Sequence, residues 1–111
     1  MEIQEMDTMD NKEVHIDVDQ IRLLIAERKG EIKREFKAEV VGIFGSYARG
    51  EEKEGSDIDF LVRFGKGATL FDLGRLGDYL EDLFGVPVDI VSERALHSLM
   101  KDEVLKELVP V

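Results

Sequence analysis

The sequence predicts an α+β fold in which a small β-sheet is backed by helices. Three short runs are rich in β-branched and aromatic residues, the segments between them repeat apolar residues at helical spacing, and glycines stand at the junctions. The predicted order is helix, strand, strand, helix, strand, helix. A chain of 111 residues suits one domain, because it holds too little apolar material for two independent cores.

The first helix is predicted over residues 18–37. Asp17 and Gln20 have the spacing of a capping box, in which each side chain bonds the other residue's backbone N–H. A mainly apolar set then follows helical spacing: Ile21, Leu24, Ile25, Arg28, Ile32 and Phe36. Gly30 interrupts this pattern at a cost of about 1 kcal/mol relative to alanine, and we expect the helix to continue through it.

Three strands are predicted, over residues 40–44, 57–64 and 87–91. In the second strand, side chains alternate between two faces of the sheet. One face is apolar and carries Ile58, Phe60, Val62 and Phe64, whereas the other carries Asp57, Asp59, Leu61 and Arg63. The apolar face is therefore expected to pack against helices.

Two further helices are predicted in the C-terminal half. Thr69 is expected to cap the first, with Asp72 as its partner, and Gly85 is expected to end it. Ser92 is expected to cap the last helical region. The residues of that region that repeat every four positions are predicted to form a core stripe: Leu96, Met100, Val104 and Leu108.

Composition restricts the classes of function. The net charge is −10, whereas nucleic-acid binding through phosphates needs a positive surface, so no direct nucleic-acid partner is expected. Residues 1–16 are predicted to be an acidic flexible tail, and residues 17–111 a single domain. The chain has no cysteine, no apolar run of membrane-spanning length and no secretory signal pattern, so we expect a cytoplasmic protein without membrane contact.

Aspartates occur where strands disfavour them. Asp57 and Asp59 are two residues apart, so both project from one face with Cα atoms about 6–7 Å apart. Two like charges so close become favourable when a divalent cation lies between them. Asp89 stands between apolar residues of the third predicted strand and reaches the same place if the two strands are neighbours. An Asp-x-Asp pair is also common as a solvated edge or turn cap, so the pair alone does not decide.

A glycine-serine pair precedes the aspartates. Gly45 and Ser46 follow the first predicted strand and open a short helical turn, where backbone N–H groups and the serine hydroxyl can bind phosphate oxygens. An ordinary strand-to-helix turn is the commoner role of such a pair. Gly45 and Gly50 also have the spacing of a P-loop, but Glu51 and Glu52 occupy the positions where that motif needs lysine and a hydroxyl. The P-loop interpretation therefore fails.

Taken together, the motifs resemble a known family. Residues 44–50 (Phe-Gly-Ser-Tyr-Ala-Arg-Gly), 56–62 (Ser-Asp-Ile-Asp-Phe-Leu-Val) and 88–91 (Val-Asp-Ile-Val) are similar to the minimal nucleotidyltransferase (MNT) proteins of the DNA polymerase β-like nucleotidyltransferase superfamily. Three separated segments agree in order and spacing, and the resemblance covers roughly residues 17–108. It implies the polymerase β-like nucleotidyltransferase fold, with a mixed sheet and helices on one side.

The resemblance also implies roles for individual residues in a mechanism with two Mg²⁺ ions. Gly45 and Ser46 would hold the β and γ phosphates of ATP. Asp57 and Asp59 would ligate Mg²⁺, and Asp89 would ligate the catalytic ion and help to deprotonate the acceptor hydroxyl. Arg49 is a candidate for neutralising phosphate charge, although an exposed loop arginine is as often merely solvated.

Many members of this family are antitoxins paired with a HEPN-domain ribonuclease toxin, and some attach AMP to a toxin tyrosine. The resemblance therefore implies a protein adenylyltransferase that acts on a partner toxin. The alternative is a non-catalytic antitoxin that neutralises its partner by occlusion, and transfer to a small molecule is a third option. Of the remaining candidates, His15 and His97 are expected at the surface, and Tyr47 is expected to pack in the core.

Overall fold

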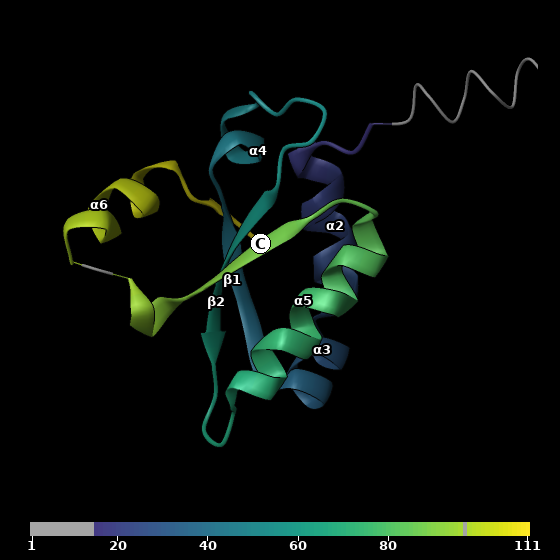
Figure 1. The fold of residues 1–111 in the computed structure, drawn as a ribbon, viewed down its shortest axis with the longest axis vertical. Coiled ribbons are helices and arrows are strands. Elements are labelled where there is room, and N and C mark those ends of the chain that lie inside the picture. Colours follow the sequence, from purple (N-terminus) through teal and green to yellow (C-terminus); the bar gives the residue numbers. More distant parts are fainter. Residues whose placement is uncertain (1–14, 97) are drawn as a thin grey trace, which may run out of the picture.

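The computed structural model describes residues 15–96 and 98–111 and has the predicted α+β architecture. His97 and residues 1–14 of the predicted tail lie outside the described residues, while Ile16 packs against the core. The elements, labelled as in Figure 1, are α2 (Val18–Glu27), α3 (Lys29–Phe36), β1 (Ala38–Phe44), α4 (Ser46–Arg49), β2 (Ile58–Phe64), α5 (Leu70–Phe84), β3 (Val88–Ser92), the 3₁₀ turn η1 (Glu93–Ala95), α6 (Ser98–Glu107) and β4 (Val109–Pro110).

The strands form one four-stranded mixed sheet in the order β3-β2-β1-β4. β1 pairs antiparallel with both β2 and β4, whereas β2 and β3 are parallel and are joined by α5. The pairing of β1 with β2 shifts register between Val40 and Gly42. β3 lies at one edge of the sheet, and Asp89 is its exposed residue.

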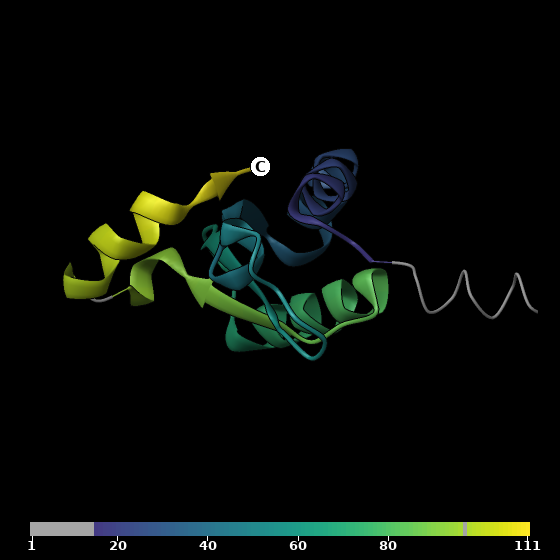
Figure 2. The ribbon, with the colours of Figure 1, turned by 90° about the horizontal axis from the view of Figure 1, so that it is seen from above.

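Helices α2, α3 and α5 lie on one side of the strands, and α6 lies on the other (Figures 1 and 2). The core lies between the sheet and helices α2, α3 and α5. Its almost completely buried residues include Phe60, Ile21, Ile25, Ile32, Ile43, Leu76 and Leu80. As predicted, Ile58, Phe60 and Val62 of β2 belong to this core, so the face of β2 that carries Asp59 is turned away from α2, α3 and α5.

The predicted single helix over residues 18–37 is wrong, because the chain forms two helices that meet at Arg28. Arg28 leaves helical geometry, with φ −112° and ψ 13°. Its N–H bonds the Ile25 carbonyl at 2.9 Å, and its guanidinium bonds the Leu24 carbonyl at 3.2 Å. Both helices contribute buried apolar residues to the core. The predicted capping box is confirmed, since Gln20 N–H donates to Asp17 Oδ1 at 2.9 Å and Asp17 N–H to Gln20 Oε1 at 3.0 Å.

The C-terminal prediction is wrong in two respects. The region after Ser92 is divided into η1 and α6, and Ser92 makes no side-chain capping bond. Met100 is 58% exposed rather than part of a core stripe, although Val104 is buried. The strand β4 was not predicted; it is only two residues long and pairs with Gly42 and Ile43 of β1.

Other local predictions are confirmed. Thr69 N–H donates to Asp72 Oδ2 at 2.8 Å at the start of α5, and Gly85 ends that helix in the left-handed conformation. Tyr47 is buried in the core, and His15 is an exposed residue whose ring contacts the Glu52 carboxylate at 2.7 Å. In the described part of the chain, no helix is both long enough and apolar enough to cross a membrane.

Candidate active site

The two aspartate-bearing strands are neighbours. β2 and β3 run parallel, and Asp59 lies directly opposite Asp89 in their register. Residues opposite one another on adjacent strands project from the same face, so these two carboxylates share one side of the sheet. Asp57 lies immediately before the first residue of β2, two positions from Asp59. The sequence placed Asp89 near Asp57 and Asp59 only if the second and third predicted strands are neighbours. They are neighbours, so the three aspartates lie in one region of the sheet.

The electrostatics of Asp59 reflect this crowding. Its pKa is raised from 3.8 to about 6, first by burial and then by the negative charges of Asp89 and Asp57. Asp57 and Asp89 are exposed, whereas Asp59 is partly buried between β1 and β3. The charged form of Asp59 thus lacks sufficient compensation from the chain itself, although Arg49 lowers the pKa in part. A bound cation would supply the missing compensation.

Gly45 turns the chain at the end of β1 and lies against Asp59. Its φ of +78° lies in the region that side chains rarely adopt. A Cβ atom at this position would overlap the Asp59 carboxylate. Glycine is therefore needed here for two reasons, a backbone conformation and a close approach. The turn that was predicted to bind phosphate is in contact with the carboxylate that was predicted to bind metal.

Arg49 belongs to an ionic cluster that the sequence did not indicate. Its Nε donates to Glu51 Oε1 at 2.9 Å, and its Nη1 lies 3.2 Å from both carboxylate oxygens of Glu107. Glu107 also accepts the backbone N–H of Gly45 at 2.9 Å. The one available signal was the position of Glu107 at the C-terminal end of a helix, where the helix dipole disfavours a negative charge.

The chemistry of these donors fits Mg²⁺. Carboxylate oxygens are hard ligands. The pKa of Asp59 is raised first by burial and then by repulsion from Asp89 and Asp57, and a divalent cation would favour its charged form. Among residues 15–96 and 98–111, no three His, Asp or Glu side chains form a ready-made metal cluster. Mg²⁺ commonly takes only one or two carboxylates and completes its shell with water and substrate phosphates. An open set of aspartates is therefore the type of site that would bind Mg²⁺ together with a nucleotide.

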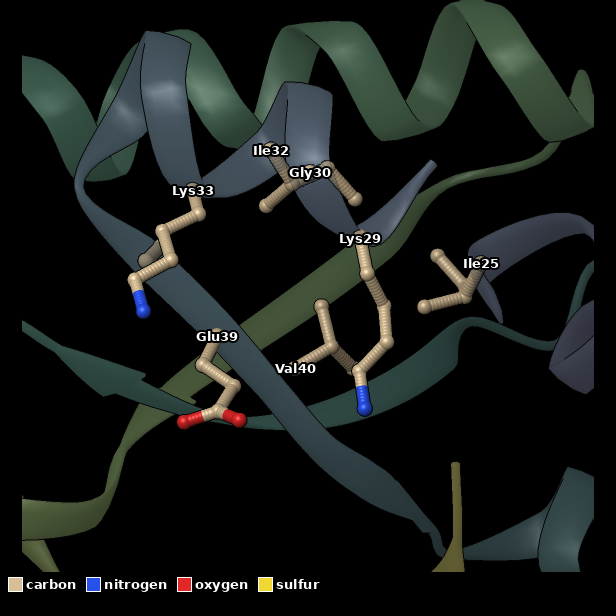
Figure 3. Close-up of a pocket in the computed structure, with 8 residues that line it drawn as sticks. Ile25, Lys29, Gly30, Ile32, Lys33, Glu39 and Val40 are labelled. Atoms are coloured by element: carbon tan, nitrogen blue, oxygen red, sulfur yellow. The ribbon is translucent and has the colours of Figure 1, made fainter. Parts of the chain in front are cut away.

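A pocket of about 200 Å³ lies elsewhere in the molecule. Figure 3 shows it between the α2–α3 junction and β1, with Ile25, Ile32 and Val40 around it and the amino groups of Lys29 and Lys33 at its rim. None of the aspartates, Gly45, Ser46 or Arg49 lines it. The pocket is therefore separate from the charged site.

The mixed sheet and the aspartates together are typical of nucleotidyltransferases, and comparison with known proteins agrees with that class. Residues 25–111 match the family model described as "Nucleotidyltransferase domain". The chain therefore belongs to the nucleotidyltransferase domain family, as the resemblance in the sequence implied, and it is a nucleotidyltransferase.

Individual relatives narrow this class. The chain is 39% identical to the protein adenylyltransferase MntA of Thermococcus cleftensis over 94 residues, which are 85% of this chain and 95% of the relative. A solved structure assigned as a minimal nucleotidyltransferase is 44% identical, with a TM-score of 0.73 over 87% of this chain and 98% of the other. These relatives place the chain among the MntA-like minimal nucleotidyltransferases.

A more distant structure shares the fold alone. A chain from the complex of the tri-AMPylated HEPN toxin of Shewanella oneidensis with its MNT antitoxin is 20% identical, with a TM-score of 0.56. The match covers 79% of this chain and 69% of the other. It agrees with the mixed sheet described above.

Proposed function

We propose that this chain is a protein adenylyltransferase that transfers AMP from ATP to a hydroxyl of a partner HEPN toxin, as the antitoxin of the pair. The observation that carries the proposal is the placement of Asp59 opposite Asp89 and against Gly45. The 39% identity to a protein adenylyltransferase supports the reaction, and the fold shared with a toxin–antitoxin complex supports the partner. We place the reaction in the cytoplasm.

Some residues of the site bind ATP, which donates the AMP group, and one meets the hydroxyl that accepts it. The backbone and hydroxyl of the Gly45–Ser46 turn, with the Arg49 guanidinium, bind the β and γ phosphates of ATP. Asp57, Asp59 and Asp89 would hold the Mg²⁺ ions beside the triphosphate. When bound, Mg²⁺ neutralises phosphate charge and stabilises the attacking and leaving oxygens.

Asp89 is the residue best placed to meet the acceptor. It lies on β3, one of the two edge strands of the described sheet, and its side chain is exposed, whereas Asp59 is flanked by strands on both sides. A hydroxyl carried by another protein can therefore approach Asp89, whose carboxylate takes the hydroxyl proton. The acceptor oxygen forms a bond to the α-phosphorus, the bond to the bridging oxygen of pyrophosphate breaks, and pyrophosphate leaves.

The surface suits a protein acceptor. The net charge of −10 complements a basic partner such as an RNA-cleaving toxin, and such complementarity raises association rates and specificity. Large apolar side chains are also exposed on three helices, namely Leu23 on α2, Leu70 and Phe71 on α5, and Met100 and Leu105 on α6. Exposed residues of this kind are common where a partner binds.

The test compares Asp57→Ala with the matched control Asp82→Ala, an exposed aspartate of α5. With purified partner, Mg²⁺ and ATP, the wild type and the control should add AMP to the partner, as measured by mass spectrometry. Asp57→Ala should lose several kcal/mol of transition-state stabilisation, a loss on the order of 10³-fold or more in rate, with its melting temperature retained.

Full transfer by Asp57→Ala would contradict the assignment of the site. If the wild type binds and neutralises the partner without adding any mass, occlusion rather than adenylylation is the mechanism.

A further inference from the structure

Glu107 contacts the same groups that the proposed reaction needs for ATP. Its carboxylate accepts the Gly45 N–H at 2.9 Å and lies 3.2 Å from Arg49 Nη1 through each of its oxygens. We propose that the Glu107 carboxylate competes with the phosphates of the nucleotide for Gly45 and Arg49, and thereby sets the affinity of the site for ATP. The inference rests on the proposed function, because it needs these two groups to bind phosphate.

The competition follows from the number of donors. Gly45 has a single backbone N–H, and it is already donated to a carboxylate oxygen. Carboxylate and phosphate oxygens are equivalent acceptors for an N–H group and for one side of a guanidinium fork. A phosphate that bonds Gly45 and the Nη1 of Arg49 must therefore displace Glu107 from both.

Glu107 is held by these contacts against two unfavourable interactions. It is the last residue of α6, where the partial negative charge of the helix end opposes a carboxylate. It is also close enough to the aspartates for its charge to contribute to the raised pKa of Asp59. Both interactions weaken when the side chain turns away, so its contacts with Gly45 and Arg49 are what retain it.

The displacement needs little structural change. The Glu107 side chain keeps 32% of its accessible surface, and Glu107 is not among the residues of the main hydrophobic cluster. The following strand β4 is held to β1 by the pairs Gly42–Pro110 and Ile43–Val109, which a rotation of the Glu107 side chain leaves in place. The apparent dissociation constant for ATP is then the intrinsic constant divided by the fraction of molecules in which Glu107 is displaced.

The test is the variant Glu107→Gln, which keeps the size and an acceptor oxygen but removes the charge. Glu103→Gln is the matched control, since Glu103 lies one turn earlier on α6, is exposed and makes the same change in net charge. ATP with Mg²⁺, and separately inorganic tripolyphosphate, are titrated calorimetrically into each protein. Glu107→Gln should bind both about two- to fivefold more tightly, as expected for the loss of one partly exposed charged contact, and the control should match the wild type.

An unchanged or weaker affinity in Glu107→Gln overturns the inference, and so does an equal gain in Glu103→Gln, which would indicate general charge repulsion. The role of Glu107 and the proposed function are tested by different results. If the wild type binds ATP and adenylylates its partner while Glu107→Gln binds no more tightly, only the role of Glu107 is wrong. If the wild type binds neither ATP nor tripolyphosphate, the phosphate site itself is wrong, and this inference falls with it.

Discussion

At its N-terminal end, strand β1 borders the pocket with lysines at its rim, and at its C-terminal end it runs into Gly45 beside the Asp59 carboxylate. The first region is a well-formed hollow whose apolar wall includes Ile25, Ile32 and Val40. The second brings several carboxylates together and raises the pKa of one of them. The difference teaches that concavity and unbalanced charge mark different regions of this fold. The site proposed above is the charged one, because a site for Mg²⁺ and a triphosphate is incomplete until both are bound.

Among changes that compare the two ends of β1, the largest effect is expected from Gly45→Ala. A methyl group there meets the Asp59 carboxylate and must also adopt a φ of +78°, at a cost of roughly 1–2 kcal/mol in stability. A displaced carboxylate on the order of 1 Å from its place can reduce transfer about 100-fold. Gly30→Ala is the control, because a Cβ there meets no atom within 4 Å, and alanine in α3 should stabilise the protein by about 1 kcal/mol. Chemical denaturation and AMP transfer measure both.

If Gly45→Ala transfers AMP as fast as Gly30→Ala, the close approach of Gly45 to Asp59 has no part in the reaction. The comparison between the two ends of β1 would then lose its main support at the charged end.

A pH-dependent effect is expected from Asp59→Asn in the absence of divalent cations. The folded-state pKa of about 6 exceeds the ordinary value of 3.8, so the folded protein binds the extra proton more tightly than the unfolded chain. The favourable contribution of protonated Asp59 to folding stability is complete below pH ~4 and is lost as the pH rises through 6. In chelator, Asp59→Asn should therefore melt above the wild type at pH 7.5, and the difference should close toward pH 4.

Thermal melts at the two pH values check this, and added Mg²⁺ should raise the melting temperature of the wild type more than that of Asp59→Asn. If the difference in melting temperature between the two proteins stays constant from pH 4 to 7.5, ionised Asp59 is not destabilised by its burial and its neighbouring charges.

The smallest effect is expected at the other end of β1. Lys33→Ala removes an amino group from the rim of the pocket, and a surface change of this kind should alter the free energy of unfolding by no more than about 0.5 kcal/mol. AMP transfer should be unchanged. A tenfold loss of transfer in this variant would place part of the working site in the pocket and would reverse the comparison.

Local signals predicted the elements well where one interaction dominates. The capping pairs at Asp17 and Thr69 and the glycine end of α5 follow from contacts within a few residues, and all were confirmed. Alternation along β2 predicted which side chains enter the core, because one strand presents only two faces. The failures lie where packing overrides a local pattern. The helical periodicity of the sequence continues through Arg28, although one helix ends and the next begins there. Met100 has the spacing of a core stripe but is 58% exposed.

The candidate site could be proposed from the sequence because its residues are anomalous for their positions: aspartates in strands, and a glycine-serine pair at a strand end. Those anomalies, together with their spacing, indicated from the sequence alone which residues form the candidate site and which family the chain resembles. Only the tertiary structure decided that β2 and β3 pair with Asp59 opposite Asp89, and that Glu107 returns to Gly45 from 62 residues away. The physical reason is that periodicity and capping record interactions between near neighbours, whereas strand order and long-range ion pairs depend on how the whole chain packs.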